Sequence, residues 1–83
     1  MTVRVWVPEV WDVVRLEAGA EWTVERLKAE ALRQATGRAP NGEAYEVKFR
    51  GALVLDESAT LGGLGAPDNA SFIVLPAKRR PAR

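Results

Sequence analysis

The sequence contains no cysteine and no histidine among its 83 residues. Without cysteine the chain forms no disulfide, no thiolate nucleophile, and no zinc–thiolate or iron–sulfur site. Without histidine it lacks the commonest general acid–base residue and the commonest metal ligand. We therefore expect a protein that is not an enzyme, has no catalytic residue, and holds no metal ion and no cofactor.

Long apolar runs are also missing. No segment approaches the roughly 20 apolar residues that a membrane-spanning helix needs, and the N-terminus has no apolar signal-peptide region. These absences predict a soluble, cytoplasmic protein without a membrane span. The length allows one domain, whose small core makes every large apolar side chain important. The many Ala, Arg, Gly and Val residues suggest a bacterial source.

Charge is nearly balanced, with 12 basic and 11 acidic residues, but it is unevenly distributed. The last seven positions hold basic residues and no acidic one, namely Lys78, Arg79, Arg80 and Arg83. We interpret residues 1–76 as the folded domain and residues 77–83 as a flexible basic tail. Such a tail is usually only solvated, but it is also compatible with weak binding to nucleic acid.

The first half of the chain predicts a hairpin followed by a helix. Residues 2–7 alternate between apolar and polar side chains, as a half-buried strand does. A second strand is expected over residues 10–18, and the short break at Pro8 and Glu9 favours an antiparallel hairpin. Apolar side chains spaced by threes and fours predict an amphipathic helix over residues 24–36.

Both ends of that helix carry capping signals. Thr23 precedes the helix as a candidate N-cap, and Gly37 follows it as a candidate left-handed C-cap. Trp22 and Leu27 have the spacing of a hydrophobic staple. The helix would place its charged side chains on the solvent side, namely Arg26, Lys28, Glu30 and Arg33.

The second half predicts strands. Residues 45–50 alternate with Tyr45, Val47 and Phe49 facing inward, residues 53–55 form a short edge strand, and residues 71–75 form the last strand. Residues 56–65 read as a loop, and the apolar run of the last strand ends at Pro76. Together the patterns predict an α+β domain.

This order of elements resembles the ubiquitin family across residues 2–75. Three stretches carry the likeness, at residues 23–29, 47–51 and 55–61. The resemblance implies a ubiquitin-like β-grasp, which is a mixed four- to five-stranded sheet with one helix packed on one face. It places the first and last strands side by side in parallel at the sheet centre. The implied core is Val3, Val5, Val7, Val14, Leu16, Val24, Leu27, Ala31, Val47, Phe49, Leu55, Leu61, Leu64, Phe72 and Val74.

In the ubiquitin family, the sheet face opposite the helix is the main recognition surface. The resemblance places Trp6, Ile73 and Leu75 near one another on this outer face. Four basic residues would surround them, namely Arg4, Arg15, Lys48 and Arg50. An apolar centre with a charged rim is typical of a protein-binding patch, although a one-sided sheet also exposes apolar area without binding anything.

Lys48 falls where the ubiquitin family places an important apolar residue. The resemblance therefore implies a protein partner other than the standard ubiquitin receptors. Trp11, in the first hairpin, is either an exposed anchor or is folded over the sheet edge. We expect the protein to act as a monomer.

The chemistry of conjugation needs a C-terminal Gly-Gly, and the printed sequence ends in Ala82 and Arg83. It is similar in size, organisation and the absence of a terminal Gly-Gly to the YukD-like proteins associated with type VII secretion. The first hypothesis is thus a non-conjugated bacterial ubiquitin-like protein that docks a partner on its outer sheet face. The alternatives are a ubiquitin-like modifier or sulfur carrier that requires C-terminal processing, and a small effector subunit of a multicomponent enzyme.

Overall fold

The computed structural model describes residues 1–38 and 41–77. The predicted basic tail residues Lys78, Arg79, Arg80 and Arg83 lie outside the described residues. In the first hairpin, β1 (Thr2–Val7) pairs antiparallel with β2 (Asp12–Glu17) through a 3-10 turn, η1 (Pro8–Val10). The second strand is therefore shorter than the predicted 10–18, because the proline starts a turn that includes Val10.

Helix α1 (Val24–Thr36) has the predicted bounds and both predicted caps. The Thr23 hydroxyl accepts a hydrogen bond from the backbone N–H of Arg26 at 3.1 Å. Gly37 has φ of 76°, and its N–H donates to the carbonyl of Arg33 at 2.8 Å. Glycine suits this left-handed position because it carries no Cβ.

The first turn of α1 is also held by the loop before the last strand. The backbone N–H of Val24 donates to the carbonyl of Ala59, and that of Glu25 donates to the carbonyl of Glu57, both at 3.0 Å. Helix N-termini leave such N–H groups without partners inside the helix. The loop therefore satisfies these donors and is positioned against the helix.

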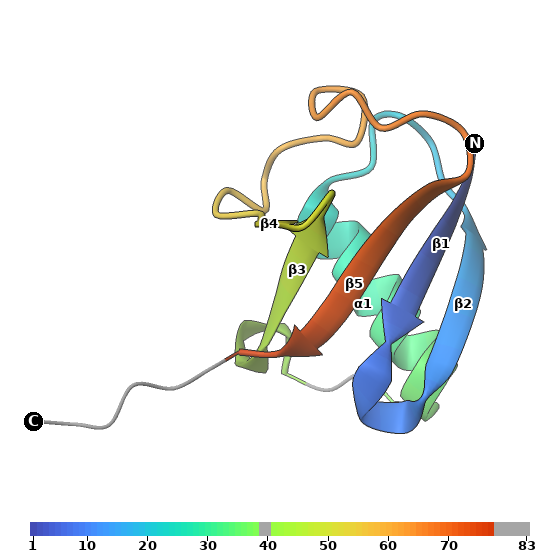
Figure 1. The fold of residues 1–83 in the computed structure, drawn as a ribbon, viewed down its shortest axis with the longest axis vertical. Helices are drawn as coiled ribbons and strands as arrows, with labels where there is room; N and C mark the ends of the chain where they lie inside the picture. The colour runs from blue at the N-terminus through green and yellow to red at the C-terminus, as the bar shows by residue number, and fades with distance from the viewer. Residues whose placement is uncertain (39–40, 78–83) are drawn as a thin grey trace, which may run out of the picture.

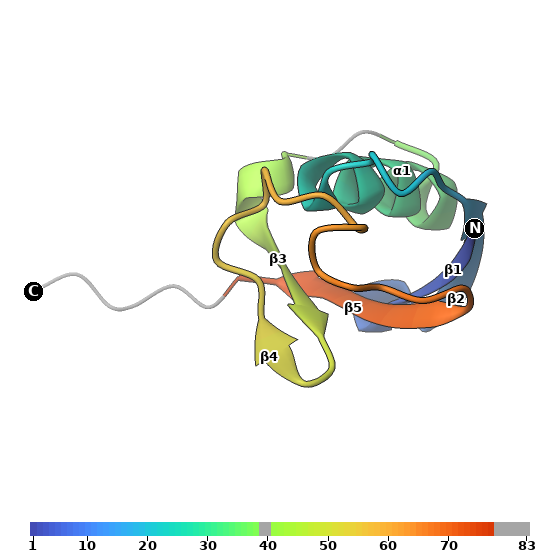
Figure 2. The same cartoon turned by 90° about the horizontal axis from the view of Figure 1, so that it is seen from above.

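The sheet is completed by β3 (Tyr45–Phe49), β4 (Ala52–Leu53) and β5 (Ala70–Pro76), and a short 3-10 turn, η2 (Gly42–Ala44), precedes β3. The strand order in this five-stranded sheet is β2-β1-β5-β3-β4. Strands β1 and β5 pair in parallel at the centre, and β5 pairs antiparallel with β3 (Figure 1). Helix α1 covers one face of the sheet and leaves the other uncovered (Figure 2). The arrangement confirms the expected α+β, ubiquitin-like β-grasp fold.

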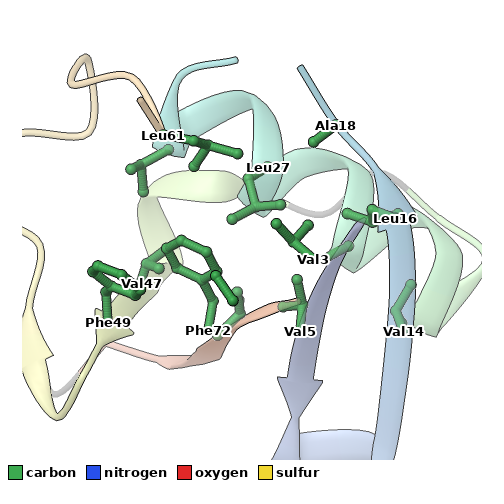
Figure 3. Packing of buried hydrophobic residues seen from close by; sticks show 14 of the residues in the cluster. Val3, Val5, Val14, Leu16, Ala18, Leu27, Val47, Phe49, Leu61 and Phe72 are labelled. Atoms are coloured by element: carbon green, nitrogen blue, oxygen red, sulfur yellow. The ribbon is translucent and has the colours of Figure 1, made fainter. Parts of the chain in front are cut away.

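The core lies between α1 and the inner face of the sheet (Figure 3). Alternate residues of β1 and β5 point inward and meet the apolar stripe of the helix. Phe72 stacks on Phe49 with ring centroids 4.7 Å apart. The buried apolar residues are Val3, Val5, Val7, Val14, Leu16, Ala18, Val24, Leu27, Ala31, Leu32, Val47, Phe49, Leu61, Ala70, Phe72 and Val74.

Two residues predicted to be in the core are not fully buried. Leu55 is 87% exposed, so its assignment to the core was wrong. Strand β4 ends at Leu53, two residues earlier than predicted, and Leu55 therefore lies beyond the sheet. Leu64 is only partly buried and packs on the edge of the core.

The position of Lys28 also differs from the prediction. Lys28 was predicted on the solvent side of the helix, but its side chain is buried and only 4% exposed. Its ammonium group lies 2.6 Å from a carboxylate oxygen of Glu57 and donates a hydrogen bond to the carbonyl of Tyr45 at 3.1 Å. The long aliphatic stem of lysine allows such burial when the charged end finds partners. The pair joins the helix, the loop and the start of β3.

Replacing Lys28 with Met is expected to lower the free energy of unfolding by about 1–3 kcal/mol. The substitution keeps an apolar stem but leaves the Glu57 carboxylate and the Tyr45 carbonyl without their donor. Glu57 is partly exposed, so water limits the loss. The control is Arg33→Met, which removes a cation from the exposed Glu30 pair on the same helix and should cost less than about 1 kcal/mol. Equal melting temperatures for the two variants would contradict this account.

Candidate functional site

The uncovered face of the sheet presents side chains in two rows that run across the strands. The Trp6 row contains Val13 of β2, Trp6 of β1 and Ile73 of β5, and then continues through Lys48 of β3 to Leu53 of β4. Each residue is the register partner of the next. The Arg4 row contains Arg15 of β2, Arg4 of β1 and Ser71 of β5. These two rows define the outer-face surface.

The Trp6 row is substantially exposed at its apolar end. Trp6 is 42% exposed and Val13 is 53% exposed, whereas Ile73 is half-buried. Together with Arg4, Ser71 and Phe72, these residues line a shallow depression of about 290 Å³. A partly exposed Trp beside a depression has the features of an interaction hot spot, since Trp is enriched at such positions.

The basic side chains on this face form no ion pair with other residues that the structure describes. Arg4 and Arg15 are direct cross-strand partners, and like charges in that position repel each other. Within residues 1–38 and 41–77, neither arginine forms an ion pair, and neither does Lys48. Glu17 lies two residues beyond Arg15 on the same face of β2, where it accepts a hydrogen bond from the Thr2 hydroxyl at 2.5 Å. The two rows that define the outer-face surface therefore contain three basic residues and no acidic one.

The structure brings together some of the predicted binding residues and separates others. Trp6, Ile73 and Arg4 lie side by side as expected, and Leu75 follows on the same face of β5, paired with Glu46. Lys48 lies inside the Trp6 row, between Ile73 and Leu53, and not at its rim.

Arg50, also predicted at the rim, lies just beyond β3. It has φ of 55°, and its guanidinium sits 4.9 Å from the centroid of the Phe49 ring. Strand β3 ends at Phe49, one residue before the predicted end, because the chain turns at this left-handed position.

Val13 was missing from the predicted binding residues. It precedes Val14, which was assigned to the core, and successive residues of a strand point to opposite faces, so Val13 belongs on the outer face. The pairing of Trp6 with Val13 follows once the hairpin register is known. Leu53 was missed because it belongs to a strand of only two residues. In both cases the residue type was already compatible with a binding surface, because both side chains are apolar.

Of the two alternatives for Trp11, the structure shows the exposed one. It ends the turn between β1 and β2, is 86% exposed, and has φ of 54° and ψ of 43°. A bulky residue in the left-handed region is strained, at a cost of about 1 kcal/mol or more. The hairpin that supplies Trp6 and Val13 thus holds a large apolar ring in water in an unfavourable backbone conformation.

Replacing Trp11 with Gly is expected to raise the free energy of unfolding by about 0.5–1 kcal/mol. Glycine relieves the left-handed strain, and almost no buried area is lost. For a domain of this size the melting temperature should rise by roughly 3–6 °C. Trp11→Ala keeps a Cβ and should leave stability nearly unchanged. A drop in melting temperature for Trp11→Gly would show that the ring stabilises the hairpin after all.

Tyr45 and Asp56, which lie outside the outer-face surface, each have a hydrogen-bond partner that shifts the pKa. The Tyr45 hydroxyl donates to the Glu9 carboxylate, which raises the pKa of the tyrosine and ties η1 to β3. Hydrogen bonds from Ser58 lower the pKa of Asp56 in the loop.

Among residues 1–38 and 41–77, no group of three or more potential metal ligands is assembled. In the same part of the chain, no helix has the length and apolarity to cross a membrane.

Comparison with known proteins supports the fold. No family model matches the chain, and no curated protein matches it in sequence. Among solved structures, the chain is similar to Caldiarchaeum subterraneum ubiquitin, with a TM-score of 0.79 and 15% sequence identity over 95% of each chain. At this identity the likeness concerns the fold alone. The fold is ubiquitin-like.

Proposed function

We propose that the protein is a non-catalytic interaction module that docks a partner protein on its outer-face surface. The observation that carries the proposal is the register alignment of Val13, Trp6 and Ile73 on three adjacent strands. Beside them lie two arginines that form no ion pair within residues 1–38 and 41–77. Exposed apolar side chains grouped in this way are favourable sites for burial against a partner. In this proposal the protein acts as a monomer in the cytoplasm of a bacterial cell. A relationship to the YukD-like proteins stays a prediction.

The double substitution Trp6→Ala with Ile73→Ala is expected to weaken partner binding by about thirtyfold or more, because a Trp hot spot contributes about 2 kcal/mol or more. Both side chains point away from the core, so cooperative unfolding should be retained. The measurement uses a photo-crosslinking residue at Val13 in cells of the source organism. The partner recovered in this way is then titrated against each variant.

The control is Val10→Ala with Leu55→Ala, which removes two exposed apolar side chains outside the two rows. This pair should bind the partner as the parent does. Equal binding by the Trp6/Ile73 variant and the control would exclude the outer-face surface as the docking site. A crosslinked species that persists when Trp6 and Ile73 are both alanine would do the same.

The structural likeness to a ubiquitin also keeps the modifier hypothesis under test. The sequence has one adjacent glycine pair, Gly62 and Gly63, in the loop before β5. Cleavage after Gly63 would remove β5, the strand between β1 and β3 at the sheet centre. Mass spectrometry that detects a protein-linked adduct or a C-terminal thiocarboxylate in the source cells would replace our proposal with this alternative.

A further inference from the structure

The two rows on the outer-face surface differ in chemistry and run parallel to each other. Over β2, β1 and β5 one row is apolar, with Val13, Trp6 and Ile73, and the other carries Arg15, Arg4 and Ser71. Neighbouring strands are about 4.8 Å apart, and residues on the same face of a strand are about 6.8 Å apart. The face therefore presents an apolar stripe and a cationic stripe, each roughly 10 Å long.

The two arginines of the cationic stripe are placed so that they can bind an anionic group of a partner. Arg4 and Arg15 face each other directly, and neither forms an ion pair within the described part of the chain. Guanidinium groups bind carboxylates in a bidentate geometry, and such charge-assisted hydrogen bonds are stronger than neutral ones. A carboxylate placed between the two arginines would replace repulsion with attraction. The Ser71 hydroxyl, next to Arg4, adds a further donor.

The conformation of the occupant follows from what a sheet face offers. A sheet uses its backbone groups for its own ladders, so its face presents only side chains. An extended segment laid on the apolar stripe would leave its own backbone N–H and C=O groups without partners, which is costly. A helix satisfies those groups internally. Its positions i, i+4 and i+7 span about 10.5 Å, which matches the two strand spacings between Val13 and Ile73.

We infer that the partner segment is an acidic amphipathic helix that lies across β2, β1 and β5. Its apolar stripe covers Val13, Trp6 and Ile73, and its carboxylates meet Arg15 and Arg4. This inference rests on the docking role proposed above and adds the chemistry and direction of the occupant.

The test uses a synthetic helical peptide with leucine at i, i+4 and i+7 and glutamate on the adjoining stripe. A matched peptide carries glutamine at every glutamate position. Each is titrated into the isotope-labelled full chain while backbone and indole NMR signals are followed. We expect the glutamate peptide to shift signals of Arg4, Trp6, Val13, Arg15, Ser71 and Ile73 and to bind at least tenfold more tightly than the glutamine peptide. Added salt should reduce the difference.

The arginine pair is tested with the double variant Arg4→Gln and Arg15→Gln. It should remove the preference for the glutamate peptide while leaving the glutamine peptide's affinity unchanged. The control is Arg33→Gln with Arg38→Gln, which makes the same change in net charge in and just after α1 and should preserve the preference. An equal loss of preference in both variants would show a net-charge effect and would overturn the arginine assignment.

Other outcomes separate this inference from the docking role. Equal binding of both peptides on the outer-face surface would overturn acidic recognition and leave docking standing. If neither peptide binds, or if the shifts appear on α1 or around Leu55, the helix inference is wrong. The crosslinking experiment at Val13 then judges the docking role independently. If a single-stranded oligonucleotide displaces the glutamate peptide at lower concentration, the surface is a nucleic-acid site instead.

Discussion

Replacing Leu27 with Asp is expected to abolish cooperative unfolding, leaving the chain largely unfolded at 25 °C. Leu27 is fully buried at the centre of the helix stripe, between α1 and the inner face of the sheet. The substitution loses about 2–5 kcal/mol of apolar packing and places an unpaired carboxylate in the core at a cost of several kcal/mol more. Natural domains have only about 5–15 kcal/mol of stability, so the sum exceeds what a domain of this size can lose.

Thermal melting followed by circular dichroism measures this effect. The control is Ala29→Asp, two residues further along the same helix at an exposed position. This control introduces the same carboxylate into water and should cost no more than about 1 kcal/mol through helix propensity. A Leu27→Asp variant that melts like Ala29→Asp would show that the helix register is wrong.

Phe72→Ala is expected to lower the free energy of unfolding by about 3–5 kcal/mol. Phe72 is the largest fully buried side chain and comes from β5, the strand that joins the hairpin to β3. Its removal leaves a cavity beneath the sheet and deprives Phe49 of its stacking partner. The melting temperature should fall by roughly 15 °C or more.

Ile73→Ala is the matched control for Phe72→Ala because it changes the next residue of the same strand, on the outer face. It should cost about 1 kcal/mol, since Ile73 is only half-buried. If the two variants are destabilised equally, the assignment of inner and outer faces on β5 is incorrect.

Local signals in the sequence were sufficient for most of the fold. The alternation of residues 2–7 predicted β1 with its observed bounds, and Thr23 and Gly37 marked both ends of α1. Such signals act within a few residues, through side-chain periodicity and capping hydrogen bonds. The resemblance to the ubiquitin family supplied the parallel pairing of β1 and β5, which no local pattern specifies.

The errors came from contacts between distant parts of the chain. Lys28 is charged and was therefore predicted in solvent, but a loop residue almost thirty positions later, Glu57, supplies the partner that allows its burial. Leu55 is apolar and was predicted in the core, but the chain has already left the sheet at that point. Residue type alone predicts neither the buried ion pair of Lys28 nor the exposure of Leu55.

The sequence predicted several residues of the candidate site but not how they are arranged in rows. The resemblance to the ubiquitin family placed Trp6 and Ile73 on the outer face with Arg4 beside them, and the structure sets them side by side. The two-row arrangement required the strand registers, which put Val13 opposite Trp6 and Lys48 between Ile73 and Leu53. The conformation of Trp11 depends on the turn after Pro8, and so its exposure was undecided from the sequence.

The most direct test is an NMR footprint of the protein bound to the partner recovered from its own cells. Our account predicts that the largest changes fall on the two rows, above all at the Trp6 indole and the amides of Val13 and Ile73, while the solvent side of α1 is unaffected. A footprint centred on α1, or on the exposed segment around Leu55, would contradict it.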